Sequence, residues 1–393
     1  MDSTLNMTRA LTYGRRNSRI EGLRLLAMLA ITLNHFPWDY SVLSAGGSKG
    51  FAAQFIINLL SNFGGVGDCL FFGISAWYLS DEARGGVRKN LKRIVKLEAQ
   101  LLFFSLSLFV FAFVVPCLRN GSCSFGSLCH AIFGAVFPLS STHWWYPTSY
   151  ALFLLFIPFI NIGLRAMGKR EHFLLAFILL FLYSLFPYSF LGGLVHFDMS
   201  YSVWLFLYQY VVFTCFKWHF PEMVSERAFG LKLLGLGLFI GIGSQVVFGM
   251  PLLVMGKSML SHQLWLNTPA CLPSMFIAFG LLILAHTEEP IVCPTINKAA
   301  SGTLAVYLIL TDAAASHLIG DAMACMGQTG LSYLAIALLG SIGIFAFCIA
   351  LDLLRQRLMR PLDSVIDNCC SRLILNTAYM HRLLYQKCHR FTP

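Results

Sequence analysis

Long apolar stretches recur along this 393-residue chain and constrain its fold more than any other feature. A helix needs about 20 apolar residues to cross roughly 30 Å of hydrocarbon, and it satisfies its own backbone hydrogen bonds there. We therefore expect an all-α integral membrane protein, a bundle of about ten transmembrane helices. The expected spans are residues 20–37, 51–80, 94–116, 144–163, 171–189, 201–217, 230–249, 267–286, 301–319 and 330–353.

The composition agrees with lipid, not water, as the main solvent. Hydrophobic residues make up 57% of the chain and charged residues only 12%, well below the charged share of soluble domains. The formal net charge of +10 is spread over short segments between the apolar runs, which argues against a nucleic-acid-binding protein. The 12 cysteines are scattered, so we expect neither a disulfide framework nor a metal site, although one disulfide within 117–143 stays open.

Lysine and arginine are concentrated in every second loop. They precede the first span and follow the second, fourth, sixth and tenth, whereas the alternate segments hold only Lys49, Arg119 and Lys257. Because short cytoplasmic loops carry the positive excess, we expect both termini to be cytoplasmic. The expected organisation is a basic cytoplasmic segment 1–19, a transmembrane domain 20–353 and a cytoplasmic tail 354–393. The tail mixes apolar and basic residues, as an amphipathic helix on an anionic leaflet would.

The first expected helix carries two ionisable residues on one stripe. Arg24 and His35 are eleven residues apart, which returns to within about 20° of the same face and separates them by roughly 16 Å. With a cytoplasmic amino terminus, Arg24 lies near the inner mouth and His35 near the outer one. Glu21 faces the same way and can orient the guanidinium. A purely structural alternative stays open, in which Arg24 only sets the orientation of the helix in the membrane and His35 only packs against its neighbours. Ionisable residues within spans nevertheless usually face a polar cavity.

Several segments resemble one known family. The stretch from Glu21 to His35 is similar to the opening of the acyltransferase 3 family of membrane O-acyltransferases, in which an arginine is followed by ten residues and a histidine. Residues 64–75 resemble the family's Gly-x-Asp-Leu-Phe-Phe-x-Ile-Ser-Gly segment, with Ala76 in place of the last glycine. Further similar segments, in order, are 144–150 with Pro158 and Asn161, 204–210, 307–309 and 352–355.

Two departures from the family pattern concern the donor side. The family often has Arg-x-x-Arg at the entrance of the third span, whereas this chain has Asn90-Leu-Lys-Arg93. Lys92, Lys89 or Arg88 are the candidate substitutes for the first arginine. Relatives often have a histidine after the Tyr307-Leu-Ile segment, where this chain has Leu310.

The resemblance implies an enzyme and a division of roles. We expect a membrane O-acyltransferase, an O-acetyltransferase in the simplest case, that acylates a hydroxyl of a cell-surface or exported polysaccharide or of its lipid-linked precursor. Its expected location is a cell membrane, the bacterial cytoplasmic membrane in particular. No tightly bound cofactor is expected, because acetyl-CoA or another acyl-CoA is the donor substrate.

The chemistry of acyl transfer indicates a role for each candidate residue. A neutral imidazole near its ordinary pKa can take the hydroxyl proton, so His35 is the candidate base. Guanidinium and ammonium groups bind the phosphates of coenzyme A, and the candidates on the cytoplasmic side are Arg24, Arg88, Lys92 and Arg93.

The remaining candidates are expected to support the base and the phosphate-binding residues or to contact the substrate. Asp68 is the acid expected to hold His35 or an arginine, with Glu98 and Asp312 as alternatives. Glu21, Trp144 and Trp145 are the expected substrate contacts, although the two tryptophans also suit an aromatic belt at the membrane interface.

Two other functions stay open. A transporter of a polar or lipid-linked solute also explains many spans with buried ionisable groups, and an inactive sensor on the same scaffold is a third possibility. The shared stripe of Arg24 and His35 favours the enzyme. The sequence also shows no repeats or broken helices of the kind that transporters often have.

Overall fold

The structure, a computed structural model, describes residues 16–39, 48–82, 86–114, 125–141, 144–188, 201–255, 266, 268–365 and 368. Every regular element in these ranges is a helix. Within them, four helices are long and apolar enough to cross a membrane, or five if one bent pair counts as a single span. The all-α membrane class is therefore confirmed, whereas the ten spans and the cytoplasmic termini stay predictions. Residues 1–15 and most of the expected tail lie outside the described residues.

The helices coincide with most of the expected apolar spans. In chain order they are α2 (Ser18–His35), α4 (Ser48–Asn62), α5 (Gly64–Leu79), α6 (Val87–Phe109), η1 (Val110–Val114), α8 (Phe125–Val136), α9 (Trp145–Ala166), α10 (Lys169–Leu180), η2 (Phe181–Leu185), η3 (Phe186–Tyr188), α11 (Val203–His219), α12 (Pro221–Val224), α13 (Arg227–Ser244), η4 (Gln245–Gly249), α14 (Met250–Val254), α15 (Leu272–Thr287), α16 (Pro294–Ala300), α17 (Thr303–Leu310), α18 (Ala313–Ala324) and α19 (Gly330–Leu358).

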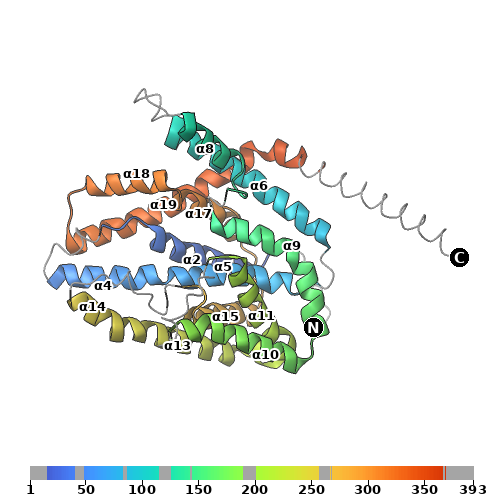
Figure 1. The fold of residues 1–393 in the computed structure, drawn as a ribbon. Coiled ribbons are helices and arrows are strands. Elements are labelled where there is room, and N and C mark those ends of the chain that lie inside the picture. The colour runs from blue at the N-terminus through green and yellow to red at the C-terminus, as the bar shows by residue number, and fades with distance from the viewer. Residues whose placement is uncertain are drawn as a thin grey trace, which may run out of the picture.

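Helices α2 and α5 lie together in the middle of the molecule, with α18 and α19 on one side and α13 and α14 on the other (Figure 1). Their close approach depends on Gly67, where an added Cβ would lie 2.6 Å from the carbonyl oxygen of Ala27. Near the end of α2, the Asn34 amide donates to the Ser61 carbonyl of α4 at 2.9 Å. The small residue lets two helix backbones touch, as in many membrane helix pairs.

Aromatic packing fixes α5 against α9 and α11. The Phe72 ring stacks on Phe206 with centroids 4.2 Å apart and meets Phe153 edge-on at 5.1 Å. All three side chains are buried. Such pairs add about 0.5–1.5 kcal/mol beyond the area they bury, so the position of α5 is well defined.

Polar side chains close the carboxyl-terminal end of α5. Lys217 donates to the Trp77 carbonyl at 2.6 Å and pairs with Asp81 at 2.8 Å, while Arg165 donates to the Ser80 carbonyl at 2.7 Å. Cations at this end satisfy free carbonyls and complement the negative end of the helix dipole. Lys217 and Arg165 belong to the expected basic loops, and these contacts account for their positive charge without a bound ligand.

One expected span is broken, which corrects the prediction of a continuous helix over residues 301–319. Helix α18 turns away from the segment Pro294–Leu310 by 83°. The cause is Asp312, whose carboxylate accepts the backbone amides of Ala314 and Ala315 at 3.1 and 3.2 Å and so starts a new helix. The sequence-based expectation that broken helices are absent is therefore wrong here. The expected span 51–80 is formed by α4 and α5, which follow one another as a single candidate span, Gly50–Leu79.

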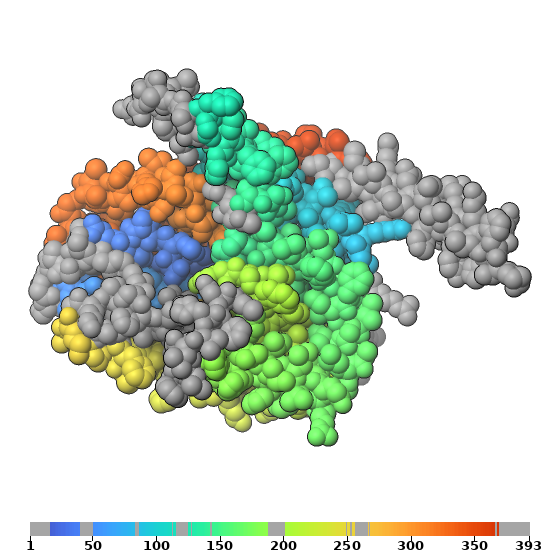
Figure 2. All heavy atoms as spheres, in the orientation of Figure 1, coloured from blue at the N-terminus to red at the C-terminus, as the bar shows by residue number. Residues whose placement is uncertain are grey.

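Helix α8 lies within the segment expected to be an outer loop, 117–143. It packs on α6, where the Ser105 hydroxyl donates to the Gly134 carbonyl at 3.4 Å, and it projects from the main body in teal in Figure 2. Phe125 and Phe133 are 81% and 56% exposed. This apolar surface is typical of a helix that contacts lipid.

Candidate active site

The first residues of the site lie on α2. Asn17 caps this helix by accepting the Arg19 amide at 3.0 Å. One turn later, the Arg24 guanidinium and the buried Glu21 carboxylate form an ion pair at 2.9 Å. The Arg24 side chain keeps 23% of its surface exposed. The arginine is therefore held in place while one side of it stays accessible.

His35 occupies the last turn of the same helix and faces α17. Its ring meets Tyr307 edge-on, with centroids 6.3 Å apart. The Tyr307 ring in turn lies 6.1 Å from Tyr146 of α9. His35 keeps some accessible surface, whereas Tyr307 and Tyr146 are buried. The histidine thus borders an aromatic cluster contributed by two other helices.

Tyr146 carries a buried hydroxyl for which the described residues offer no hydrogen-bond partner. Its ring is enclosed by Phe71 at 5.7 Å and Phe206 at 5.0 Å and lies over Tyr150 at 6.4 Å. A buried polar group without a partner costs free energy, so a catalytic role or a bound molecule is one explanation for it. The hydroxyl is a donor that is free to meet an incoming group.

Asp68 faces this cluster from α5. It lies close enough to Tyr146 and Tyr307 to interact electrostatically with both hydroxyls. Phe71 and Ser75 follow Asp68 on the same helix face by their spacing, and Ser75 hydrogen-bonds to Tyr150. Asp68 and Ser75 are deep in the protein but keep accessible surface. They are not sealed in the core.

The second predicted arginine lies on α6 and is held by two partners. Arg93 makes a two-point contact with Glu82, at 2.5 and 3.2 Å, and donates to the Asn90 side chain at 2.9 Å. Buried Asn90 donates onward to the Leu154 carbonyl of α9 at 2.9 Å. Asn90, which stands where the family often has arginine, therefore positions Arg93 and joins two helices.

Glu82 is the anion of this group. Partial burial raises its pKa, but hydrogen bonds and charge from Arg93 and Lys89 outweigh burial and hold the pKa below its ordinary value. Its ion pairs with Lys89 and Arg93 measure 2.7 and 2.5 Å. The carboxylate is ionised at neutral pH.

Tyr150 lies within electrostatic range of both arginines. Its hydroxyl interacts electrostatically with both Arg24 of α2 and Arg93 of α6. The structure therefore brings these two predicted donor-side residues to one region. Arg88 is exposed in the first turn of α6, and its five-residue separation from Arg93 places it about 140° around the helix. Lys92 is partly exposed beside Arg93.

The two tryptophans lie in different surroundings. Trp144 is only 1% exposed, and its indole nitrogen donates to the Leu308 carbonyl of α17 at 3.2 Å. It packs between helices and presents no open ring face. Trp145 keeps accessible surface and meets Tyr146 and Tyr201 edge-on at 5.4 and 5.0 Å. Of the pair, Trp145 is the one that an incoming molecule can reach.

The alternatives to Asp68 lie elsewhere. Asp312 uses its carboxylate to cap α18. Glu98 lies on α6, and its Oε2 atom is buried without a hydrogen-bond partner among the described residues. Within those ranges, no three His, Cys, Asp or Glu side chains are arranged to hold a metal ion.

The aromatic cluster of Tyr146, Tyr150 and Tyr307 was not predicted as part of the site. All three residues lie in segments that resemble the family, which was the available signal. Aromatic residues near a membrane interface are also typical of a belt, and sequence alone does not separate the two cases.

Comparison with known proteins agrees with the sequence resemblance. The profile of a family described as an acyltransferase domain, Acyl_transf_3, matches residues 17–353. No curated protein and no solved structure shows significant similarity to the chain.

Proposed function

The chain belongs to the acyltransferase 3 family, and on that premise we propose that it transfers an acyl group, acetyl in the simplest case, from acyl-CoA to a sugar hydroxyl. The acceptor is a cell-surface or exported polysaccharide or its lipid-linked precursor, and the enzyme works in the bacterial cytoplasmic membrane. The observation that carries this proposal is the arrangement along α2. Arg24 lies near one end of the helix and His35 at the other. Asp68 of α5 and Tyr146 and Tyr150 of α9 lie close to one another beside them.

On the acceptor side, His35 acts as general base. Its neutral imidazole takes the proton of the sugar hydroxyl as the oxygen forms a bond to the thioester carbonyl carbon. The carbon–sulfur bond then breaks, and the departing coenzyme A thiolate receives the proton from the imidazolium. Tyr307, whose ring meets the imidazole edge-on, limits how His35 can turn.

On the donor side, Arg24 and Arg93 bind the coenzyme A phosphates. Guanidinium groups suit phosphate because they donate two parallel hydrogen bonds. Before the donor arrives, Glu21 and Glu82 hold the two arginines in position. Arg88 and Lys92 extend the basic surface of α6 and attract the donor from solvent.

The free hydroxyl of Tyr146 supplies the third part of the mechanism. Negative charge develops on the carbonyl oxygen as the acceptor attacks, and a preorganised donor in a dry site stabilises it. Tyr146 is buried and lacks a partner among the described residues, so its donor is available. Asp68 lies close to both Tyr146 and Tyr307 and adds a carboxyl group to this part of the site.

The test uses membranes that contain the protein, radiolabelled acetyl-CoA and candidate glycans. His35→Ala is expected to lower transfer by about 10²–10⁴-fold, the usual contribution of general base catalysis. Arg24→Ala is expected to raise the KM for acetyl-CoA. Matched controls are His317→Ala and Arg357→Ala, which change exposed residues on α18 and α19. Equal transfer by wild type, His35→Ala and Arg24→Ala would overturn the mechanism.

A transporter of a polar or lipid-linked solute is the second candidate. The 83° break between α17 and α18 favours it, because transporters often bind their solutes at interrupted helices. The discriminating measurement is solute uptake into proteoliposomes without any acyl-CoA. Uptake that is independent of His35 would support transport over acyl transfer.

A further inference from the structure

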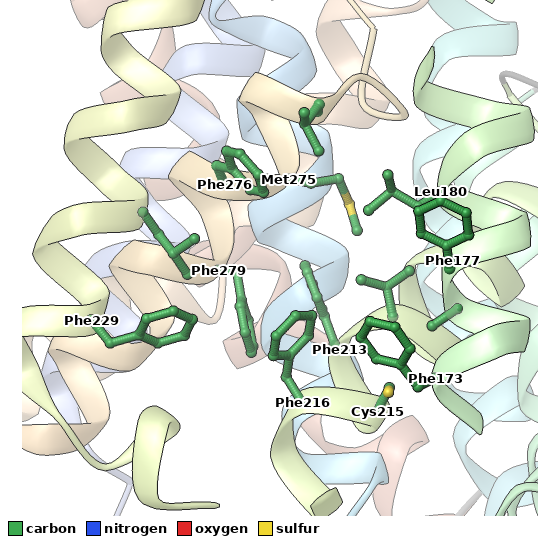
Figure 3. A pocket seen from close by; sticks show the side chains of 14 residues that line it. Phe173, Phe177, Leu180, Phe213, Cys215, Phe216, Phe229, Met275, Phe276 and Phe279 are labelled. Carbon is green, nitrogen blue, oxygen red and sulfur yellow. The ribbon is translucent and has the colours of Figure 1, made fainter. Parts of the chain in front are cut away.

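A wholly apolar pocket lies among α10, α11, α13 and α15, and the proposed mechanism uses none of the residues that line it. It has a volume of about 300 Å³, and no polar atom contributes to its surface. Figure 3 shows aromatic side chains from several helices around it, with Phe229 on one side and Phe173 and Phe177 on the other. Its size is at the lower end of small-molecule sites.

Close contacts within two pairs of helices fix the positions of the walls of this pocket. Helices α13 and α15 touch through glycine, since a Cβ added at Gly280 would lie 2.8 Å from the Gly230 carbonyl oxygen. Helices α10 and α11 are joined by buried His172, whose ring nitrogens lie 3.1 Å from the Val211 carbonyl and 3.1 Å from His219. An apolar void of this size is unfavourable when empty and does not hold ordered water. The pocket therefore favours an apolar occupant.

The pocket opens towards lipid. Phe173 and Phe177 line it and are still 48% and 54% exposed, and their neighbours Leu174 and Ile178 are exposed as well. Helix α13, which forms another wall, lies within the candidate span Arg227–Phe248. Side chains on the outer surface of a membrane span are surrounded by the acyl chains of the bilayer. A membrane lipid is the nearest source of a matching chain.

A cation marks one end of the pocket. Lys169 continues the α10 stripe of Phe173, Ala176 and Leu180 by one turn, at the positive amino-terminal end of the helix. Its ammonium lies 4.2 Å from the centroid of the Phe220 ring, and that ring is 6.3 Å from Phe173.

A second lysine lies on the opposite wall. Lys232 is exposed on α13, three residues after Phe229 of the lining, so it is within about 60° of Phe229 around the helix. The one acid in the first turn of α10, Glu171, lies against its own Gly168. Positive charge therefore borders the end of the pocket where a lipid head group would lie.

We propose that this pocket binds one acyl chain of an anionic phospholipid, with its phosphate between Lys169 and Lys232. The lipid fills a site that the acyltransferase mechanism does not use. Binding is therefore measurable without any transfer activity, and it stands whether or not the proposed function is correct.

The test reconstitutes the full chain into phosphatidylcholine vesicles containing a trace of photoactivatable lipid. The probes are phosphatidylglycerol and phosphatidylcholine that carry the same diazirine-bearing acyl chain, and labelled peptides are identified by mass spectrometry. Ala176→Phe fills the pocket from α10. The matched control, Leu174→Phe, adds the same ring at an exposed position of the same helix. A second variant, Lys169→Gln with Lys232→Gln, removes the charge and leaves the apolar lining intact.

We expect the phosphatidylglycerol probe to label the lining residues of the wild type and of Leu174→Phe. Since each buried methylene contributes about fourfold to binding, labelling should fall about tenfold or more in Ala176→Phe. The preference for phosphatidylglycerol should fall about fivefold for each lysine removed. Undiminished labelling in Ala176→Phe would overturn the proposal. If that variant does not fold, the double lysine variant decides. An unchanged preference for phosphatidylglycerol in the double lysine variant would overturn the proposal, and so would the absence of such a preference in the wild type.

Discussion

At the scale of single residues, the hydroxyl of Tyr146 separates a structural from a catalytic role. A tyrosine kept only for packing gains nothing from a buried oxygen that lacks a partner among the described residues. Its ring already has Phe71 and Phe206 as neighbours, and these contacts need no oxygen. Removing the oxygen alone therefore tests what the hydroxyl does.

Tyr146→Phe is expected to lower kcat by about 10²–10³-fold, the usual cost of losing one oxyanion donor. Its KM for acetyl-CoA should stay unchanged, since Arg24 and Arg93 are untouched. Its midpoint of thermal unfolding should stay equal or rise, because the buried hydroxyl is no longer desolvated without a partner. Steady-state kinetics and a thermal melt in detergent check both parts. A normal kcat would assign Tyr146 to packing.

The residues of the site were only partly predictable. Arg24, His35 and Asp68 were identifiable because charge within an apolar run stands out in sequence. The contact of Arg93 with Glu82 and the bridge from Asn90 to α9 were not, since the first joins α6 to the segment before it and the second joins two helices. Burial of Trp144 was hidden for the same reason. Its partner, the Leu308 carbonyl, lies 164 residues further along the chain.

At the scale of elements, the contact of α2 with α5 holds both halves of the site. Gly67 lies next to Asp68, and its missing side chain leaves room for the Ala27 carbonyl and for Ile31. Any side chain at this position would force the helices apart and move Asp68 relative to His35. The element contact thus links stability to site geometry.

Gly67→Ala is expected to destabilise the protein by about 1–3 kcal/mol, the usual cost of overpacking. The matched control is Gly163→Ala on α9, where an added Cβ meets nothing within 4 Å. In that helix the same change should be neutral or stabilise by up to about 1 kcal/mol. Thermal unfolding of both variants in one detergent gives the comparison. Equal midpoints for the two variants would contradict the tight contact.

A pH effect is expected where α5 is joined to α6. Glu82 has a lowered pKa in the folded protein, so its ionised form stabilises the fold above the unfolded value of about 4.3. That contribution is lost as the pH falls through the folded pKa. Glu82→Gln should therefore lower the unfolding midpoint at pH 7, and its difference from wild type should shrink towards pH 4 and below. Exposed Glu222→Gln is the control, and a difference that grows in acid would contradict the assignment.

Apolar runs predicted most helices, because crossing a membrane requires them. They did not predict the break before α18, which depends on a single carboxylate that caps a new helix. Nor did they predict α8, a 12-residue helix too short to register as a span. Hydropathy measures how apolar a window is, whereas these two features depend on where backbone amides find partners.

At the scale of the whole molecule, the orientation in the membrane follows from the distribution of positive charge. Two exposed or partly exposed cysteines can report, through a thiol reagent, which side of the membrane each of them faces. Cys293 is partly exposed before α16, and Cys325 is exposed at the end of α18. The predicted orientation places the first inside the cell and the second outside.

Single-cysteine variants that keep only Cys293 or only Cys325 are expected to behave oppositely in intact cells. An impermeant maleimide should label Cys325 and leave Cys293 unlabelled until the cells are opened. The measurement is a mass shift of the purified protein before and after permeabilisation. Labelling of Cys293 in sealed cells would reverse the predicted orientation.

The bend between α17 and α18 also bears on how the chain is inserted during synthesis. Helix α17 has 8 residues, about 12 Å of helix, which is less than half the hydrocarbon thickness. It is packed against α2, made long before it, and against α19, made after it. A nascent chain that ends after α18 therefore lacks one of the helices that shelter this segment. We therefore expect stable integration of the bent pair to be completed only when α19 has been made, later than the synthesis of the pair itself.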